Sequence, residues 1–167
     1  MKLAVGVQFD GEQALAAAAA FDEWDAAEPT RIYTSRIAPI EKAKRGAPDL
    51  RALPCLLHLL REHALQPEAI VIDGFVHLDA QATPGLGQHL HLALGGHCAV
   101  IGISKTPMAA TPAQFEVLRE DEAAPVVVTC AGIDLGAAKA RVRAMHGRRR
   151  LPTLLKLALR LAKGKAA

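Results

Sequence analysis

Residues 69–74 (AIVIDG) and residues 98–105 (CAVIGISK) are the stretches of sequence that decide the fold. Each is a continuous apolar run rich in β-branched residues, which is typical of a strand buried on both faces of a sheet. Between them, residues 85–95 carry leucines at helical spacing. A strand, a helix and a second strand in this order predict a βαβ unit with two parallel strands.

The residues that precede this unit predict an antiparallel meander. Residues 3–9 form an apolar strand, and Asp10-Gly11 is a hairpin-turn signal. Residues 14–21 are the expected return strand, although their alanine run also has a high helix propensity. Residues 31–37 predict a third strand.

Helices and one more hairpin are expected around these strands, with Asp49 and Asp134 as helix N-caps. The expected elements are a loop (residues 38–48), three helices (49–63, 134–145 and 152–162) and a hairpin (115–118 with 125–130). The sequence therefore predicts an α/β fold in which a mixed sheet, an antiparallel meander plus parallel strands, is flanked by helices. We expect one domain over residues 1–167, with a basic helical segment at about residues 135–165.

The composition narrows the class of protein. Half of the residues are hydrophobic and 22% are charged, which suits a globular protein, and no apolar run is long enough to cross a membrane. Gln8 and Asp10 interrupt the apolar start, so a first strand is expected there rather than a signal peptide. Three widely spaced cysteines in apolar segments indicate reduced thiols, and we expect a cytoplasmic protein without a membrane partner.

Charge is distributed unevenly along the chain. All 17 acidic residues lie at or before Asp134, whereas ten of the 20 lysines and arginines lie after it. Such a basic segment is typical of a protein that contacts a polyanion, and residues 148–150 (RRR) are its densest cluster. The alternative is a solvated helix face that offsets an acidic body.

The candidate chemistry lies where the two parallel strands end. Asp73 follows the first strand and Lys105 follows the second, and ligands of open α/β sheets bind beyond the carboxyl ends of such strands. A carboxylate beside a cation can hold Mg²⁺ and a phosphate oxygen. The alternative is that Asp73 caps a turn and Lys105 is solvated.

Six short motifs, in order along nearly the whole chain, resemble those of endonuclease V. They are residues 5–10 (VGVQFD), 49–54 (DLRALP), 71–74 (VIDG), 85–90 (GLGQHL), 101–105 (IGISK) and 150–152 (RLP). The family consists of metal-dependent nucleases of DNA repair that cut beside deaminated bases. The resemblance implies an RNase H-like fold.

The chain departs from the family at the metal ligands. The family binds its metal through an aspartate on the first strand, a glutamate at a helix start and the aspartate of the Asp-Gly motif. The corresponding residues here are Gln8, Ala52 and Asp73, so only the last carboxylate is retained. Asp10, which shares a strand face with Gln8, and Asp79, from the loop after Asp73, are candidate replacement ligands. The alternative is that Asp10 is simply the first residue of its turn.

Two hypotheses follow from the resemblance. In the first, the protein is an endonuclease for inosine-containing DNA or RNA, in which Asp73, Asp10 and Asp79 hold Mg²⁺ or Mn²⁺. Asp73 and Lys105 would then be catalytic, and Lys105, with the arginines of the 148–150 cluster (Arg148, Arg149 and Arg150), would contact the nucleic acid. In the second, the protein is a catalytically inactive scaffold that binds nucleic acid or a protein partner.

Overall fold

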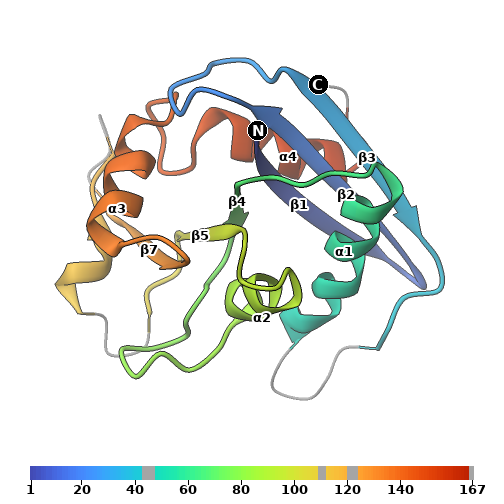
Figure 1. Ribbon diagram of the computed structural model, residues 1–167, viewed down its shortest axis with the longest axis horizontal. Helices are drawn as coiled ribbons and strands as arrows, with labels where there is room; N and C mark the ends of the chain where they lie inside the picture. The colour runs from blue at the N-terminus through green and yellow to red at the C-terminus, as the bar shows by residue number, and fades with distance from the viewer. Residues whose placement is uncertain (43–47, 109–111, 120–123, 166–167) are drawn as a thin grey trace.

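A seven-stranded mixed sheet forms the centre of the molecule, in the strand order β3-β2-β1-β4-β5-β7-β6 (Figure 1). The computed structural model describes residues 1–42, 48–108, 112–119 and 124–165 of the chain. The strands are β1 (Lys2–Asp10), β2 (Gln13–Phe21), β3 (Arg31–Ile37), β4 (Ala69–Asp73), β5 (Ala99–Ser104), β6 (Glu116–Val117) and β7 (Val126–Ala131). The helices are η1 (Pro48–Arg51), α1 (Ala52–Glu62), α2 (Leu86–Ala93), η2 (Ala113–Phe115), α3 (Leu135–Ala144) and α4 (Thr153–Ala162).

The strand pairing confirms the predicted topology. Strands β1, β2 and β3 pair antiparallel as a meander, and β4 lies parallel to both β1 and β5. Strand β7 then pairs antiparallel with β5, and the short β6 pairs with β7. The RNase H-like mixed sheet flanked by helices is therefore confirmed.

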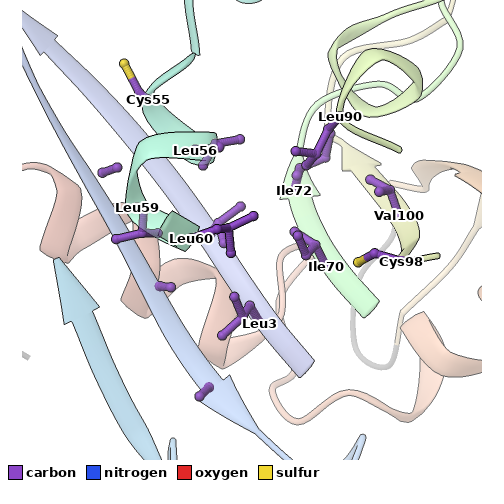
Figure 2. Packing of buried hydrophobic residues seen from close by; sticks show 14 of the residues in the cluster. Leu3, Cys55, Leu56, Leu59, Leu60, Ile70, Ile72, Leu90, Cys98 and Val100 are labelled. Atoms are coloured by element: carbon purple, nitrogen blue, oxygen red, sulfur yellow. The ribbon is translucent and has the colours of Figure 1, made fainter. Parts of the chain in front are cut away.

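Helices cover both faces of the sheet (Figure 1). On one face, Leu56, Leu59 and Leu60 of α1 and Leu90 of α2 belong to one buried cluster with the inward side chains of the central strands (Figure 2). On the other face, α3 and α4 pack on the alternate residues of the same strands. Successive side chains of β1 and β4 point to opposite faces of the sheet, so each strand contributes residues to both cores.

The alanine run of β2 is a strand because its neighbours in the sheet override local propensity. Ala16, Ala18 and Ala20 belong to the core under α1, whereas Ala19 and Phe21 belong to the core under α4. Small side chains on both faces let the two helical layers approach the sheet closely. Backbone pairing with β1 and β3 along the whole run then satisfies its N–H and C=O groups.

Two helix starts differ in how well the sequence predicted them. The Asp134 side chain accepts a hydrogen bond from the Ala137 backbone N–H, as expected of the N-cap of α3. Helix α1, by contrast, begins at Ala52 with Arg51 at its N-cap position, so Asp49 lies in η1 and the prediction of its capping role is wrong. Part of the loop expected at residues 38–48 lies outside the described residues. None of the helices in the described ranges is long and apolar enough to span a membrane.

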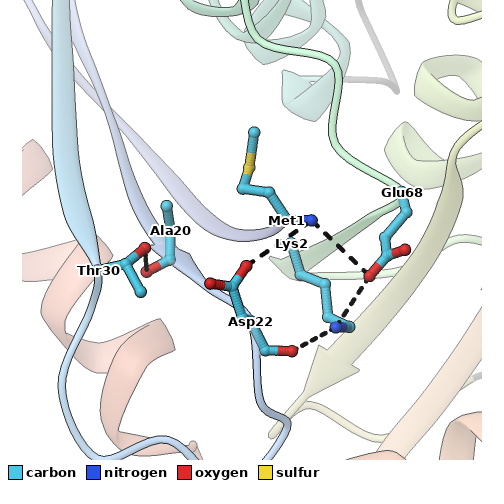
Figure 3. A network of polar contacts seen from close by, with 6 residues as sticks. All are labelled: Met1, Lys2, Ala20, Asp22, Thr30 and Glu68. Carbon is cyan, nitrogen blue, oxygen red and sulfur yellow. Dashed lines mark hydrogen bonds and ion pairs between the residues drawn. The ribbon is translucent and has the colours of Figure 1, made fainter.

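Charged groups fix the amino ends of β1 and β4 (Figure 3). The Lys2 ammonium lies 2.9 Å from the Glu68 carboxylate and donates to the carbonyl oxygen of Asp22. The N-terminal amino group lies 3.9 Å from the carboxylates of both Asp22 and Glu68. Exposed pairs of this kind contribute little stability. They join the start of β1 to the residues that precede β4 and follow β2, at the end of the sheet opposite Asp73.

Candidate nucleic-acid-binding crevice

The candidate site lies at a step in the sheet where β1 runs past the end of β4. The last pair between the two strands joins Val5 to Ile72, whereas β1 continues to Asp10 against β2. A pocket of about 180 Å³ opens at this step. Its lining comes from β1, β4 and the helices above them: Val5, Gly6, Val7, Ala52, Leu56, Ile72, Asp73, Leu86 and Leu159.

Asp73 supplies the carboxylate of this pocket. Solvent reaches its side chain at the end of β4, yet protein atoms packed around the carboxyl group desolvate it and raise its pKa. The positive charges of Lys105 and Lys163 oppose this rise. The site thus contains one acid within electrostatic range of two cations.

The two lysines reach Asp73 from different layers. Lys105 follows β5, the strand parallel to β4, as the sequence predicted for a residue at the same edge of the sheet. Lys163 is the C-cap residue of α4, the helix that packs on the face of the sheet opposite α1. Sequence reasoning missed Lys163, because the helical pattern of residues 152–162 does not show where the end of that helix lies relative to Asp73 in the folded protein.

The residues around Asp73 do not fit a magnesium site. Among the described residues of the lining, Asp73 is the one carboxylate, and the helix-start position expected to carry a glutamate is the methyl group of Ala52. Mg²⁺ requires oxygen ligands in near-octahedral geometry, but the other described side chains of the lining, from β1, α1 and α4, are hydrocarbon. Within the described ranges, no group of three His, Cys, Asp or Glu side chains could hold a metal ion.

Gln8 and Asp10 line a different pocket. They share a face of β1, as their spacing predicts, but they line a hollow of about 480 Å³ together with Arg36 and Lys163. Gly6 is the residue that continues the β1–β4 register beside Asp73. The structure therefore does not bring Gln8 or Asp10 into the lining of the Asp73 pocket.

Gly6 allows α4 to lie directly against β1. A Cβ atom added at this position would be 3.1 Å from the carbonyl oxygen of Ala158 and 3.2 Å from the Cα of Leu159. These contacts are with backbone atoms, which cannot rotate away. A side chain of any size beside Asp73 on β1 would therefore require α4 to move.

Asp79 is held in a local turn. Its carboxylate accepts hydrogen bonds from the backbone N–H groups of Gln81 and Thr83 and from the Thr83 hydroxyl, at 2.6 to 3.1 Å. The bonds from Thr83 keep the pKa of Asp79 below its ordinary value. Its oxygens thus stabilise the loop between β4 and α2.

The arginines of the 148–150 cluster have different environments. Arg150 donates to the carbonyl oxygen of Lys105 at 2.9 Å and to that of Pro125 at 2.6 Å, so it ties the loop after β5 to the C-terminal segment. Arg148 and Arg149 are exposed. The structure gives Arg150 a structural contact with the Lys105 loop, in addition to the role in nucleic-acid binding predicted from sequence.

Arg119 is a buried arginine that the sequence did not single out. Its guanidinium donates to five backbone carbonyl oxygens at the end of α3 and in the connection to α4: Val142, Met145, His146, Gly147 and Arg149. The side chain is 3% exposed, and burial lowers its pKa. These hydrogen bonds fix the conformation of the connection between α3 and α4. They thereby help to set the position of α4, whose C-cap residue is Lys163.

No protein-family model and no curated protein matches this sequence. Solved structures do match, and several of them are structures of endonuclease V. The Ciona intestinalis endonuclease V, in complex with DNA containing an inosine followed by a ribo-adenosine, has a TM-score of 0.78 at 14% identity; the match covers 98% of this chain and 84% of that one.

Two bacterial structures agree with this assignment. Endonuclease V from Streptomyces avermitilis has a TM-score of 0.70 at 24% identity, over 96% of this chain and 76% of that chain. The Bacillus subtilis endonuclease V has a TM-score of 0.69 at 22% identity, over 97% and 76%. The resemblance inferred from the six sequence motifs is thus confirmed at the level of the fold.

Proposed function

We propose that this protein binds nucleic acid through the crevice beside Asp73, without a bound metal ion. The observation that carries this proposal is the charge of the site, where Lys105 and Lys163 lie within electrostatic range of one carboxylate. A phosphodiester brings negative charge, and two ammonium groups at the edge of a crevice neutralise it in place of a metal.

The surrounding surface extends this cationic edge. Lys163 also lines the neighbouring hollow, where Arg36 adds a second positive charge and Asp10 contributes one negative charge. Lys105 and Lys163 are both exposed, so a phosphate can reach them without displacing protein atoms. A strand of nucleic acid lying across the end of α4 would meet Lys105, Lys163 and Arg36 in succession.

The comparisons support the same proposal. The Ciona protein shares its fold with 98% of this chain and was solved in complex with DNA. Arg148 and Arg149, exposed in the basic C-terminal segment, would add to the attraction.

Salt-dependent binding tests the proposal. Fluorescence anisotropy of a labelled single-stranded oligonucleotide, in EDTA, should show a dissociation constant that rises with salt. Lys105→Gln and Lys163→Gln should each weaken binding and lower the salt slope by roughly one unit. Arg61→Gln is the matched control, because Arg61 is exposed in the last turn of α1, far from the start of that helix beside Asp73. A dissociation constant that does not change with salt concentration, or no binding at all, would contradict the proposal and favour a protein partner.

Metal-dependent cleavage is the second candidate, favoured by the retention of Asp73 and Lys105 at the positions that the resemblance assigns to the nuclease centre. The described residues around Asp73 do not offer the set of oxygen donors that Mg²⁺ requires. Incubation of an inosine-containing oligonucleotide with excess protein and Mg²⁺ or Mn²⁺ separates the two candidates. An intact oligonucleotide excludes cleavage, whereas a product that Asp73→Ala abolishes establishes it.

A further inference from the structure

The outer side of α4 carries a stripe of positive charge. Lys156, Arg160 and Lys163 recur at spacings of four and three residues, so they lie on one side of the helix, and all three are exposed. Lys163 also lines the hollow beside the crevice. The α4 stripe therefore begins at the proposed binding site and runs back along the helix. The opposite side of α4 packs on the sheet through its buried residues: Leu154, Leu155, Ala158 and Ala162.

The charges of the α4 stripe do not favour the helix itself. Like charges three or four residues apart on a helix repel one another. Lys156 is the fourth residue of α4, close to the positive pole of the helix dipole. A solvated helix face normally mixes both signs of charge, but neither α4 nor the rest of the chain after Asp134 contains an acidic residue. An anionic partner explains this pattern better than the stability of α4 does.

The composition of α4 suits contacts with phosphate groups rather than with bases. The helix consists of Thr, Leu, Lys, Ala and Arg residues and has no aromatic side chain. Proteins that hold single strands place aromatic side chains along the strand, so that the bases stack on them. In a double helix the bases are already stacked, and the protein is positioned by its contacts with the phosphates. The α4 stripe is thus suited to double-stranded nucleic acid.

The length of the α4 stripe matches a short run of phosphates. From Lys156 to Lys163 the helix rises by about 10 Å. One strand of a duplex advances by about 3.4 Å along its axis for each phosphate, so this length follows roughly three of them. Arg148 and Arg149, exposed in the connection that leads into α4, extend the positive charge beyond Lys156.

We propose that the exposed side of α4 binds the phosphate backbone of double-stranded nucleic acid, with Lys156 and Arg160 as contacts outside the crevice. Each of these cations neutralises a phosphate and releases its counterions. This inference rests on the proposed function, since the α4 stripe continues the cationic edge of the crevice at Lys163. It adds a second surface to that site and a preference for a duplex.

Fluorescence anisotropy with two labelled probes tests the inference. One probe is a single strand, the other is the same strand paired with its complement, and both are titrated in EDTA over a range of salt. In Lys156→Gln/Arg160→Gln, the duplex should bind about ten-fold or more weakly at about 0.1 M salt, and its salt slope should fall by roughly two units. The slope for the single strand should change by less than about one unit, because it loses no contact with α4.

Two further variants locate the effect. Arg31→Gln/Arg61→Gln removes the same number of charges from exposed positions on β3 and α1, and should leave both probes bound as in the wild type. Lys156→Arg/Arg160→Lys keeps the charge and should bind the duplex as the wild type does. Glutamine has a helix propensity close to that of lysine and arginine, so α4 should persist in every variant, and melting temperatures verify this.

The outcomes separate the two proposals. If Lys156→Gln/Arg160→Gln binds the duplex as tightly as the wild type, the α4 surface is refuted; the crevice still stands if Lys105→Gln and Lys163→Gln weaken the single strand. If the single strand loses as much affinity as the duplex, the assignment to double-stranded nucleic acid is overturned. If neither probe binds the wild type, the proposed function and this inference both fail.

Discussion

Replacing Arg119 with methionine tests the role assigned to the buried guanidinium. Its Nε donates to the Arg149 carbonyl at 2.7 Å, and one terminal nitrogen donates to Gly147 at 2.7 Å and to Met145 at 3.0 Å. The last carbonyl groups of a helix lack partners within the helix and form its negative pole. Arg119 therefore satisfies the end of α3 and fixes the turn that leads into α4.

The magnitude follows from these bonds. A hydrogen bond from a charged donor contributes about 1.5–3 kcal/mol, so the three short bonds give roughly 5–9 kcal/mol before desolvation of the guanidinium, which costs several kcal/mol, is subtracted. Methionine keeps the apolar volume but leaves the carbonyl groups without donors. We expect the free energy of unfolding to fall by about 3–5 kcal/mol.

Urea unfolding followed by circular dichroism measures this change directly. In a thermal scan the same loss lowers the melting temperature by roughly 6–20 °C for a chain of this size. Arg61→Met is the control, since Arg61 is exposed on α1 and its replacement should change stability by about 0.5 kcal/mol or less. A loss below about 1 kcal/mol in Arg119→Met would refute the proposed role of the guanidinium.

Three further predictions concern the site and the cores. Burial raises the pKa of Asp73 in the folded state, so the ionised carboxylate lowers the free energy of unfolding at neutral pH. At pH 7, Asp73→Asn should therefore unfold at a higher urea concentration than the wild type. This difference should shrink as the pH falls through the raised pKa, because the wild-type carboxyl group then becomes neutral. An advantage that grows towards acid pH would contradict that sign. Gly6→Ala should lower the free energy of unfolding by about 1–3 kcal/mol because the added methyl group meets the backbone of α4, and an unchanged urea midpoint would show that α4 is not held against β1. Burial raises the pKa of Cys98 to about 11, so iodoacetamide at pH 8 should alkylate the half-buried Cys130 first, as peptide mass spectrometry would show; faster labelling of Cys98 would contradict its burial.

Much of the fold is readable from the sequence because its signals are local. The apolar runs that end at Asp73 and before Lys105 predict parallel strands, and the hairpin turn after Asp10 has the left-handed Gly11 that such a turn requires (φ 61°). Even the alanine run of β2 was predicted as a strand, since it lies between a turn signal and a third strand pattern.

The site was less predictable because it depends on register and distance along the chain. The alternation of β1 shows which residues share a face, but only the pairing of Val5 with Ile72 shows that Gly6, rather than Gln8, lies beside Asp73. Lys163 lies far along the chain from Asp73, and its place depends on how α4 crosses the sheet. Arg119 was missed for the same reason, because its partners are backbone carbonyl groups, which no side-chain pattern reveals.

The central claim is that the crevice beside Asp73 binds nucleic acid with lysines where the resemblance predicts a metal ion. The most direct test is the dissociation constant of an inosine-containing oligonucleotide, measured by anisotropy in EDTA and in Mg²⁺ at equal ionic strength. We expect the same constant in both buffers and weaker binding in the Lys105→Gln/Lys163→Gln double variant. Binding that tightens with Mg²⁺ in the wild type, and loses this response in Asp73→Asn, would contradict the claim.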